Sequence, residues 1–374
     1  MVKAGSGLAV AGGAPPSRLV ENRDNPDRPS SEDASGREAP GEVAIQNTRL
    51  GRTGLKVSRL CLGTMTFGLQ IDEPAARSVL DRAADGGVTF IDTADVYPLG
   101  GGVDLAGTTE DILGRWLKGK RHQFVLATKC FGRTGPQAWD VGNSRRHIMD
   151  AIDASLRRLG TDYVDLYQLH GDDPETPLDE TLRALDDIVR SGKVRYVGCS
   201  NFLAYRIARA LGRSEALGLA RFDSVQPRYN LLFREFEREL FPLCLEEEIA
   251  VIPYNPLAGG LLSGKHGRGQ KPAEGTRFAI PNAGTMYQDR YWHDREFETV
   301  AAFQQIANDA GLKPATLAVA WVMHNPAITA PIIGASRPDQ LDDTLAAADV
   351  KLEAGVVSRL DELTRDFRRG DASR

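Results

Sequence analysis

Four side chains of complementary chemistry stand out in this sequence: Asp92, Tyr97, Lys129 and His170. Asp92, Lys129 and His170 lie at the ends of three successive apolar runs, and Tyr97 follows the first of them by five residues. Any one of these residues could be a helix cap or an ordinary polar residue at the rim of a fold. Four of them from three consecutive segments are hard to explain in that way, and they indicate a catalytic site.

These residue types suit the protonation of an oxygen atom on which charge develops. The phenol of Tyr97 has an ordinary pKa of about 10, and we expect the Lys129 ammonium to lower that pKa by stabilising the phenolate. Asp92 can keep Lys129 charged in a desolvated pocket. His170 can donate a hydrogen bond to a carbonyl oxygen and hold it beside the phenol. The pattern therefore predicts general acid catalysis by Tyr97.

Alternating strand-like and helical segments must position these side chains. A hairpin is expected within 48–58, with Gly51 and Gly54 in its turn. Strands are then expected at 60–65, 88–93, 124–129, 164–170, 194–200, 222–226, 250–255 and 328–334. Helices are expected near 109–118, 144–159, 179–191, 203–215 and 234–248, with further helical stretches after the last two strands.

Repeated strand–helix units predict a parallel sheet, which is either doubly wound or closed into a barrel. No strand–GxGxxG–helix unit opens the fold, although a doubly wound dinucleotide-binding sheet would need one. Each expected strand also ends in a polar or small residue, and a barrel gathers all of these ends on one face. They are Thr64, Asp92, Lys129, His170, Ser200, Gln226, Tyr254 and Gly334. We therefore predict an α/β fold, a (β/α)8 TIM barrel with an N-terminal hairpin.

Composition excludes several classes of function. The net charge of −5 indicates no basic surface for nucleic acid. No run approaches the roughly 20 apolar residues of a membrane span, and the first residues make a poor signal peptide. Cys61, Cys130, Cys199 and Cys244 form no CxxC pair, and the six histidines show no ligand spacing. We expect a cytoplasmic protein with no metal.

Residues 1–47 differ in composition from the rest of the chain. They contain no aromatic residue but six glycines, five prolines and twelve charged residues. Such a segment cannot bury enough surface to offset its ordering entropy. We predict a disordered tail at 1–47 and a single domain at 48–374.

The segment GGLLSGKH at 259–266 nearly matches a phosphate-binding P-loop. His266 stands where the magnesium-binding Ser or Thr should be, and the following GRGQKPAEG cannot begin the required helix. We therefore interpret this segment as a flexible glycine-rich loop.

The ordered set of motifs along the chain resembles the aldo-keto reductase family over about 48–366. They are FIDTADVY, LATK, YQLH, GCSNF, VQPRYN, PYNPLAGGLLSGK and PIIGASRPDQLDD. The family is a (β/α)8 barrel that binds NAD(P)H without a Rossmann domain and transfers hydride to aldehydes and ketones. The resemblance implies that Tyr97 is the general acid, that Lys129 and Asp92 tune it, and that His170 orients the carbonyl.

The resemblance also implies a set of cofactor-binding residues. Ser200, Asn201 and Gln226 would bind the nicotinamide carboxamide, and Tyr254 would stack on the ring. The full set is Thr64, Met65, Asp92, Ser200, Asn201, Gln226, Tyr254, Asn255, Pro256, Leu257, Ala258, Gly259, Lys265, Arg277, Gly334, Ser336, Arg337, Gln340 and Asp343. Arg337 suits a 2′-phosphate, since guanidinium pairs with phosphate in a bidentate fork, which favours NADPH over NADH. The family usually has Asn where this chain has Thr344, and that Asn commonly contacts the adenine of the cofactor. Threonine offers a single hydroxyl instead of an amide's donor and acceptor.

Two functions remain open. The first is an NADPH-dependent carbonyl reductase, or a dehydrogenase in the reverse direction, acting on a small-molecule carbonyl substrate that can be a sugar, small aldehyde, quinone or keto-steroid. The second is a regulatory or redox-sensing subunit similar to voltage-gated potassium channel β subunits, which lack the histidine that His170 supplies here. Phe131, Trp139, Tyr291 and Trp292 are candidate pocket walls, with packing against a helix as the alternative.

Overall fold

The computed structural model describes residues 45–369. Its strands are β1 (Asn47–Arg49), β2 (Lys56–Ser58), β3 (Cys61–Gly63), β4 (Phe90–Asp92), β5 (Val125–Cys130), β6 (Val164–Leu169), β7 (Val194–Ser200), β8 (Phe222–Gln226), β9 (Ala250–Val251) and β10 (Ile332–Ile333). The predicted tail at 1–47 lies almost wholly outside the described residues. β1 already begins at Asn47, and Ile45 is buried, so the folded domain begins slightly before residue 48.

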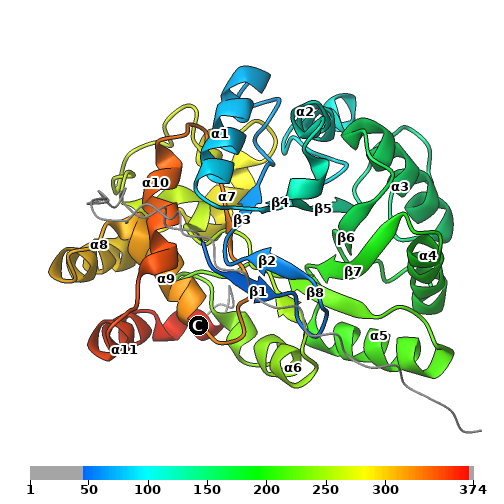
Figure 1. Ribbon diagram of the computed structural model, residues 1–374. Helices are drawn as coiled ribbons and strands as arrows, with labels where there is room; N and C mark the ends of the chain where they lie inside the picture. Colours follow the sequence, from blue (N-terminus) through cyan, green and yellow to red (C-terminus); the bar gives the residue numbers. More distant parts are fainter. Residues whose placement is uncertain (1–44, 370–374) are drawn as a thin grey trace, which may run out of the picture. The chain divides into compact units, whose positions relative to one another are not determined.

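Helices alternate with the strands and surround them (Figure 1). They are α1 (Glu73–Asp85), α2 (Thr108–Leu117), α3 (Arg145–Leu159), α4 (Leu178–Arg190), α5 (Ala204–Leu217), α6 (Leu240–Glu246), α7 (Gly284–Tyr291), α8 (Asp294–Asp309), α9 (Pro314–His324), α10 (Gln340–Leu345) and α11 (Ala354–Leu363). Among residues 45–369, no helix combines the length and the apolar composition that a membrane span needs.

The predicted barrel is confirmed. Strands β3 to β8 pair in parallel in chain order, with β9 beside β8 and β10 beside β3. Between β9 and β10 the ring is closed by backbone hydrogen bonds: Thr329 N donates to Val251 O at 2.9 Å, and Ile332 N donates to Pro253 O at 2.8 Å. All the strand ends therefore meet on one face, as the sequence predicts.

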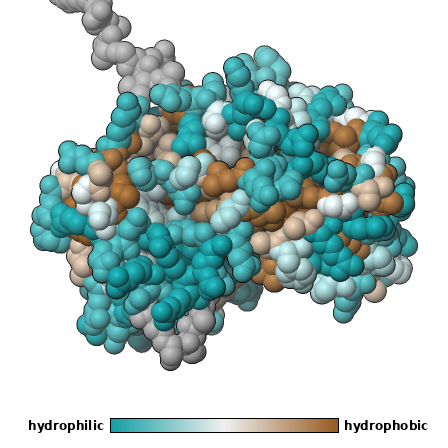
Figure 2. All heavy atoms as spheres, turned by 90° about the horizontal axis from the view of Figure 1, so that it is seen from below, coloured by the Kyte–Doolittle hydropathy of each residue, from teal (hydrophilic) through white to brown (hydrophobic). Residues whose placement is uncertain are grey.

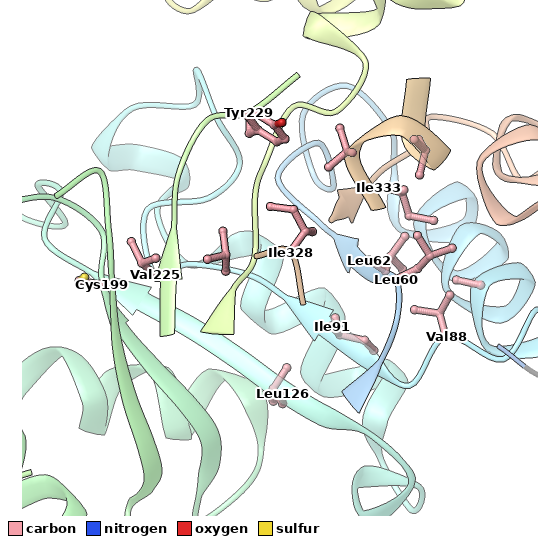
Figure 3. Packing of buried hydrophobic residues seen from close by; sticks show 14 of the residues in the cluster. Leu60, Leu62, Val88, Ile91, Leu126, Cys199, Val225, Tyr229, Ile328 and Ile333 are labelled. Carbon is pink, nitrogen blue, oxygen red and sulfur yellow. The ribbon is translucent and has the colours of Figure 1, made fainter. Parts of the chain in front are cut away.

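Alternation along the strands divides the buried residues into two layers. Every second side chain faces the helices and joins the outer core, in which Ile91, Leu126 and Val225 take part (Figure 3). The intervening side chains face the barrel axis and form a smaller inner cluster that includes Phe90 and Leu166.

The predicted hairpin closes the lower end of the barrel, which is the end at which the parallel strands begin. Its strands β1 and β2 pair in an antiparallel register, and Leu50 and Val57 join the inner cluster. Gly51 permits the close fit, because its φ is +54° and a Cβ atom there would lie 2.4 Å from Glu248 O. The hairpin acts as an apolar floor under the barrel interior.

One predicted helix is shorter than expected. The range 234–248 contains only the 3₁₀ turn Glu235–Glu237 and α6. Pro242 lies in the first turn of α6, where it is tolerated, but its ring would clash with a helical turn before it. The face shown in Figure 2 is mainly hydrophilic, with hydrophobic residues gathered in a band across it.

Candidate active site

The upper half of the barrel interior is polar, in contrast to its floor. Asp92 ends β4 two residues after Phe90, and Lys129 lies on the same side of β5 as Ala127. His170 directly follows β6. The period of two along each strand therefore brings the predicted residues to the same axis, above the apolar layer.

Lys129 is fully buried and has three hydrogen-bond acceptors. Its Nζ forms an ion pair with Asp92 Oδ2, donates to Thr93 O at 2.8 Å and lies 3.4 Å from Tyr97 Oη. These acceptors match the three N–H groups of an ammonium. Burial alone would lower the pKa of Lys129, but Asp92 and Tyr97 outweigh it, and the pKa lies above its usual value. The lysine is therefore charged at neutral pH.

The second carboxylate oxygen of Asp92 is held by two buried glutamines. Gln226 Nε2 donates to Asp92 Oδ1 at 2.8 Å, and Gln168 Nε2 donates to the same oxygen at 3.1 Å. Gln168 is not among the site residues predicted from the sequence. Its position two residues before His170 on a strand is the signal that could have found it, since both side chains must face the same way.

Tyr97 is buried, and Lys129 acts to lower the pKa of its phenol as expected, but burial acts in the opposite direction. Burial raises the pKa of the Tyr97 phenol and outweighs the lowering effect of Lys129, so the net shift is upward rather than downward. Asp92 also acts to raise this pKa and so offsets part of the effect of Lys129. Tyr97 therefore carries its proton at neutral pH, as a proton donor must.

His170 lies beside Tyr97, with ring centroids 5.7 Å apart in an edge-on arrangement. Burial, together with the charge of Lys129, lowers the pKa of His170 to about 3. The imidazole is therefore neutral at physiological pH and has one N–H to donate. Its backbone is fixed by a bond from His170 N to Cys130 O at 2.8 Å and by Asn201 Nδ2, which donates to His170 O at 2.9 Å.

A cavity of about 250 Å³ opens above these residues. The predicted site residues in its wall are Thr64, Met65, Asp92, Tyr97, His170, Ser200, Asn201, Gln226, Tyr254, Asn255 and Arg277. Tyr254 Oη donates to Asn201 Oδ1 at 2.9 Å, and Ser200 Oγ donates to Gln226 O at 2.8 Å, so the predicted carboxamide-binding residues form one connected group.

The aromatic residues named as candidate walls do not line this cavity. Tyr291 is buried and its hydroxyl accepts from Asn230 Nδ2 at 3.0 Å, while Trp292 packs on Phe278. Trp139 is exposed, with Arg146 over its ring. The wall is instead completed from α7, by Met286, Tyr287 and Arg290.

A second cavity of about 340 Å³ adjoins the first, and the two share Asn255 and Arg277. The predicted residues in its wall are Asn255, Pro256, Leu257, Gly259, Lys265, Arg277, Gly334, Ser336, Arg337, Gln340 and Asp343. Burial, and then the neighbouring charges of Arg277 and Arg337, lower the pKa of Lys265. Three cations thus gather around one cavity and favour an anion there.

Only two predicted site residues line neither cavity. Lys129 lies beneath Tyr97, and Ala258 is buried in the outer core. Ala258 belongs to a loop with unusual backbone geometry, in which Asn255 has φ +67° and Gly259 φ +70°. The Asn255 side chain holds this loop, because its Oδ1 accepts from Gly259 N and from Arg277, each at 3.2 Å. As expected, no helix follows the loop between residues 264 and 276.

The outer end of the second cavity differs from the family pattern at Thr344. Its hydroxyl is buried and donates to Leu341 O at 3.0 Å, within its own helix α10. The hydroxyl proton is therefore not available to an adenine. Nearby, the exposed Arg337 forms a fork with Asp339, with N–O distances of 3.2 and 3.3 Å.

A larger, shallower depression of about 960 Å³ lies at the opposite end of the barrel, with Arg121, Arg157 and Lys193 in its wall. None of the predicted site residues contributes to it. Within residues 45–369, no three His, Cys, Asp or Glu side chains are arranged to hold a metal ion. The chemistry therefore centres on the two adjoining cavities.

Comparisons with known proteins find relatives over most of the chain. A model of the "Aldo/keto reductase family" matches residues 59–365. The chain is 38% identical over 330 residues to "Uncharacterized oxidoreductase YrpG" of Bacillus subtilis, which covers 85% of this chain and 96% of the relative. It is 34% identical over 347 residues to "Versiconal hemiacetal acetate reductase" of Aspergillus parasiticus, and this match covers 85% of the chain and 96% of the relative. It is also 38% identical over 309 residues to "Probable voltage-gated potassium channel subunit beta" of Arabidopsis thaliana, and this match covers 82% of the chain and 92% of the relative.

Proposed function

Because this chain belongs to the aldo/keto reductase family, we propose that it is an NADPH-dependent oxidoreductase that reduces aldehydes or ketones to alcohols with Tyr97 as general acid. The observation that carries this proposal is the buried contact of Tyr97 with Lys129, whose Nζ lies 3.4 Å from the phenol oxygen, at the base of a cavity. His170, in the wall of the same cavity, supports it.

The residues of the two cavities fit NADPH. Asn255 Nδ2 is buried and has no hydrogen-bond partner among residues 45–369, so a donor is available where the cavities meet. Lys265, Arg277 and Arg337 would hold the phosphates, and Ser200, Asn201 and Gln226 the carboxamide. When bound, NADPH supplies the hydride that adds to the carbonyl carbon of the substrate.

The chain's own residues would supply the proton and the orientation. The neutral His170 donates a hydrogen bond to the carbonyl oxygen, which places that oxygen beside the Tyr97 hydroxyl. As the hydride arrives, the oxygen becomes a far stronger base than a phenolate and takes the Tyr97 proton. The raised pKa of Tyr97 does not prevent this transfer, and the charged Lys129 stabilises the phenolate that is left.

The Arabidopsis relative favours a second candidate function. Its name describes a potassium channel subunit. A cofactor-binding regulatory or redox-sensing subunit on the same barrel would use the same cofactor contacts. The two functions differ in turnover. A reductase consumes NADPH in many cycles, whereas a sensor binds it and turns over slowly or not at all.

The test is steady-state NADPH oxidation by the purified full-length chain with a panel of aldehydes, ketones, quinones and sugars. A matched series uses NADH, and NADPH binding is measured in parallel by fluorescence. We expect sustained turnover that is faster with NADPH. Tight NADPH binding without turnover of any panel member would overturn the reductase and favour the regulatory subunit.

A further inference from the structure

Arg290 lies in the wall of the cavity that holds Tyr97 and His170, and the catalytic scheme gives it no task. It belongs to α7, which also contributes Met286 and Tyr287 to that wall. Its side chain is partly buried. A long cationic side chain beside a reacting carbonyl is a candidate for selecting the substrate.

Within residues 45–369, Arg290 has neither a carboxylate at ion-pair distance nor a hydrogen-bond partner. The carboxylate in the cavity wall is that of Asp92, and its oxygens are already bound by Lys129 and the two glutamines. Arg206, another partly buried arginine, does have a carboxylate partner: it forms two hydrogen bonds to Asp172, each of 2.8 Å. The charge of Arg290 is therefore available to a ligand.

The other cation of the cavity wall, Arg277, lies at the boundary between the two cavities. It also lines the second cavity and donates to Asn255 Oδ1, so it belongs to the proposed phosphate-binding side. Arg290 lines only the first cavity. Its charge reaches the cavity interior, because it acts to lower the pKa of Tyr254, which burial raises to about 12.

The cavity wall also has apolar side chains, beside the hydroxyl group of Tyr287 on α7. Met65, Val96, Leu99 and Met286 offer no charged or hydrogen-bonding side chain. A guanidinium outside the proposed phosphate-binding side, in a cavity with apolar wall residues, suits a ligand with an apolar body and one anionic end, since guanidinium pairs with carboxylate in a bidentate fork. The volume of about 250 Å³, which the nicotinamide must share, limits the ligand to a small molecule.

We propose that Arg290 binds a carboxylate group of the substrate, so that the preferred substrates are small aldehydes or ketones that carry a carboxylate. This rests on the proposed reductase function and names its substrate class. The carboxylate sits against Arg290 while the carbonyl oxygen lies between Tyr97 and His170. The acid is thereby held with its carbonyl toward the hydride, whereas an uncharged analogue lacks the anchor.

The test compares 3- and 4-carboxybenzaldehyde with their methyl esters, which keep the aldehyde and remove the charge. We expect kcat/KM of the wild type to be at least tenfold higher for one of the acids than for its ester. In Arg290→Gln the acid-to-ester ratio should fall tenfold or more, and Arg290→Lys should retain part of it. Arg365→Gln, which removes an exposed cation from the far C-terminal turn, should keep the wild-type ratio.

Failure of the inference differs from failure of the reductase. If the wild type reduces the esters as well as the acids, or Arg290→Gln leaves the ratio unchanged, Arg290 does not bind the carboxylate although the enzyme is a reductase. If nothing is reduced, calorimetric binding of the two acids to the NADPH-loaded protein still tests Arg290. An affinity that Arg290→Gln weakens tenfold supports the carboxylate site, and an unchanged affinity removes it.

Discussion

The two halves of the barrel interior are built from the same strands and have opposite chemistry. At the lower end, Phe90 and Leu166 pack with Leu50 and Val57 of the hairpin in an apolar cluster. Two residues further along β4, Asp92 forms a buried ion pair with Lys129. The lower layer removes apolar surface from water, and the upper one accepts the desolvation of two charges. On β4, the side chain of Phe90 therefore serves stability, and that of Asp92, two residues later, serves the chemistry of the site.

Lys129→Met should give the largest effect, because Lys129 contributes both to the stability of the upper layer and to catalysis. The substitution leaves Asp92 buried without its partner, which costs about 3–5 kcal/mol of unfolding free energy. It also removes the cation beside Tyr97, so kcat should fall roughly 10²- to 10⁴-fold. Chemical denaturation and steady-state kinetics check the two effects. The double variant with Asp92→Leu should recover stability but not activity, and a single variant that stays active would contradict the role of Lys129.

Leu166→Ala should separate the two halves. Leu166 is fully buried in the lower layer, and its truncation should cost about 2–5 kcal/mol. Catalysis at the other end should persist, with kcat/KM per folded molecule within about threefold of the wild type. Leu203→Ala provides the control, since Leu203 is 59% exposed and should change stability by about 0.5 kcal/mol or less. A collapse of kcat in folded Leu166→Ala would show that the layers are coupled.

Arg337 and Asp339 test the outer edge of the cofactor site, where neither stability nor the chemical step should change. Arg337→Ala should weaken NADPH binding by about 10- to 100-fold and NADH binding much less, because the lost contact is a charge-assisted pair with the 2′-phosphate. Asp339→Asn should act in the opposite direction, since it removes the carboxylate that competes for Arg337. Fluorescence titration with both cofactors measures this. Equal losses for NADPH and NADH in Arg337→Ala would remove the 2′-phosphate role.

Asp223→Asn gives the smallest expected effect and concerns the lower end. Burial raises the pKa of Asp223, in β8 near the hairpin, from its usual 3.8 to about 6. The folded protein holds this proton more tightly than the unfolded chain, so stability falls as the pH rises from about 4 to about 6. Asparagine can keep the hydrogen bond from Val197 N, and the variant should gain on the order of 2 kcal/mol at pH 7 but little at pH 4.

Denaturation curves between pH 4 and pH 7 measure this slope. Asp104→Asn, at an exposed position, controls for the loss of one negative charge. A wild-type slope that persists in Asp223→Asn would assign the pH dependence to other groups.

The sequence predicts the upper layer well where strand geometry decides the outcome. The meeting of Asp92, Lys129 and His170 follows from the convergence of carboxyl ends in a barrel. Gln168 could have been found by the same alternation. The helix α1 also has a sequence signal, because Asp72 caps it and Pro74 lies in its first turn.

Features that depend on packing between distant segments of the chain could not be predicted from the sequence. The net direction of the Tyr97 pKa shift does not follow from the contact with Lys129, because burial of the phenol by segments far apart in the chain outweighs the effect of that lysine. Arg290 was missed for a related reason. Its position in the cavity depends on how the segment before α7 folds back over the barrel, and no local pattern in the sequence specifies that path.

The most direct measurement of the central claim is a paired determination of kcat and unfolding free energy for Tyr97→Phe, with NADPH binding as a control. The substitution removes one hydroxyl from the upper layer and leaves the apolar floor intact. We predict that kcat falls roughly 10²- to 10⁴-fold, while the affinity for NADPH is retained and the unfolding free energy changes by about 1 kcal/mol or less. Turnover equal to that of the wild type would contradict Tyr97 as the general acid.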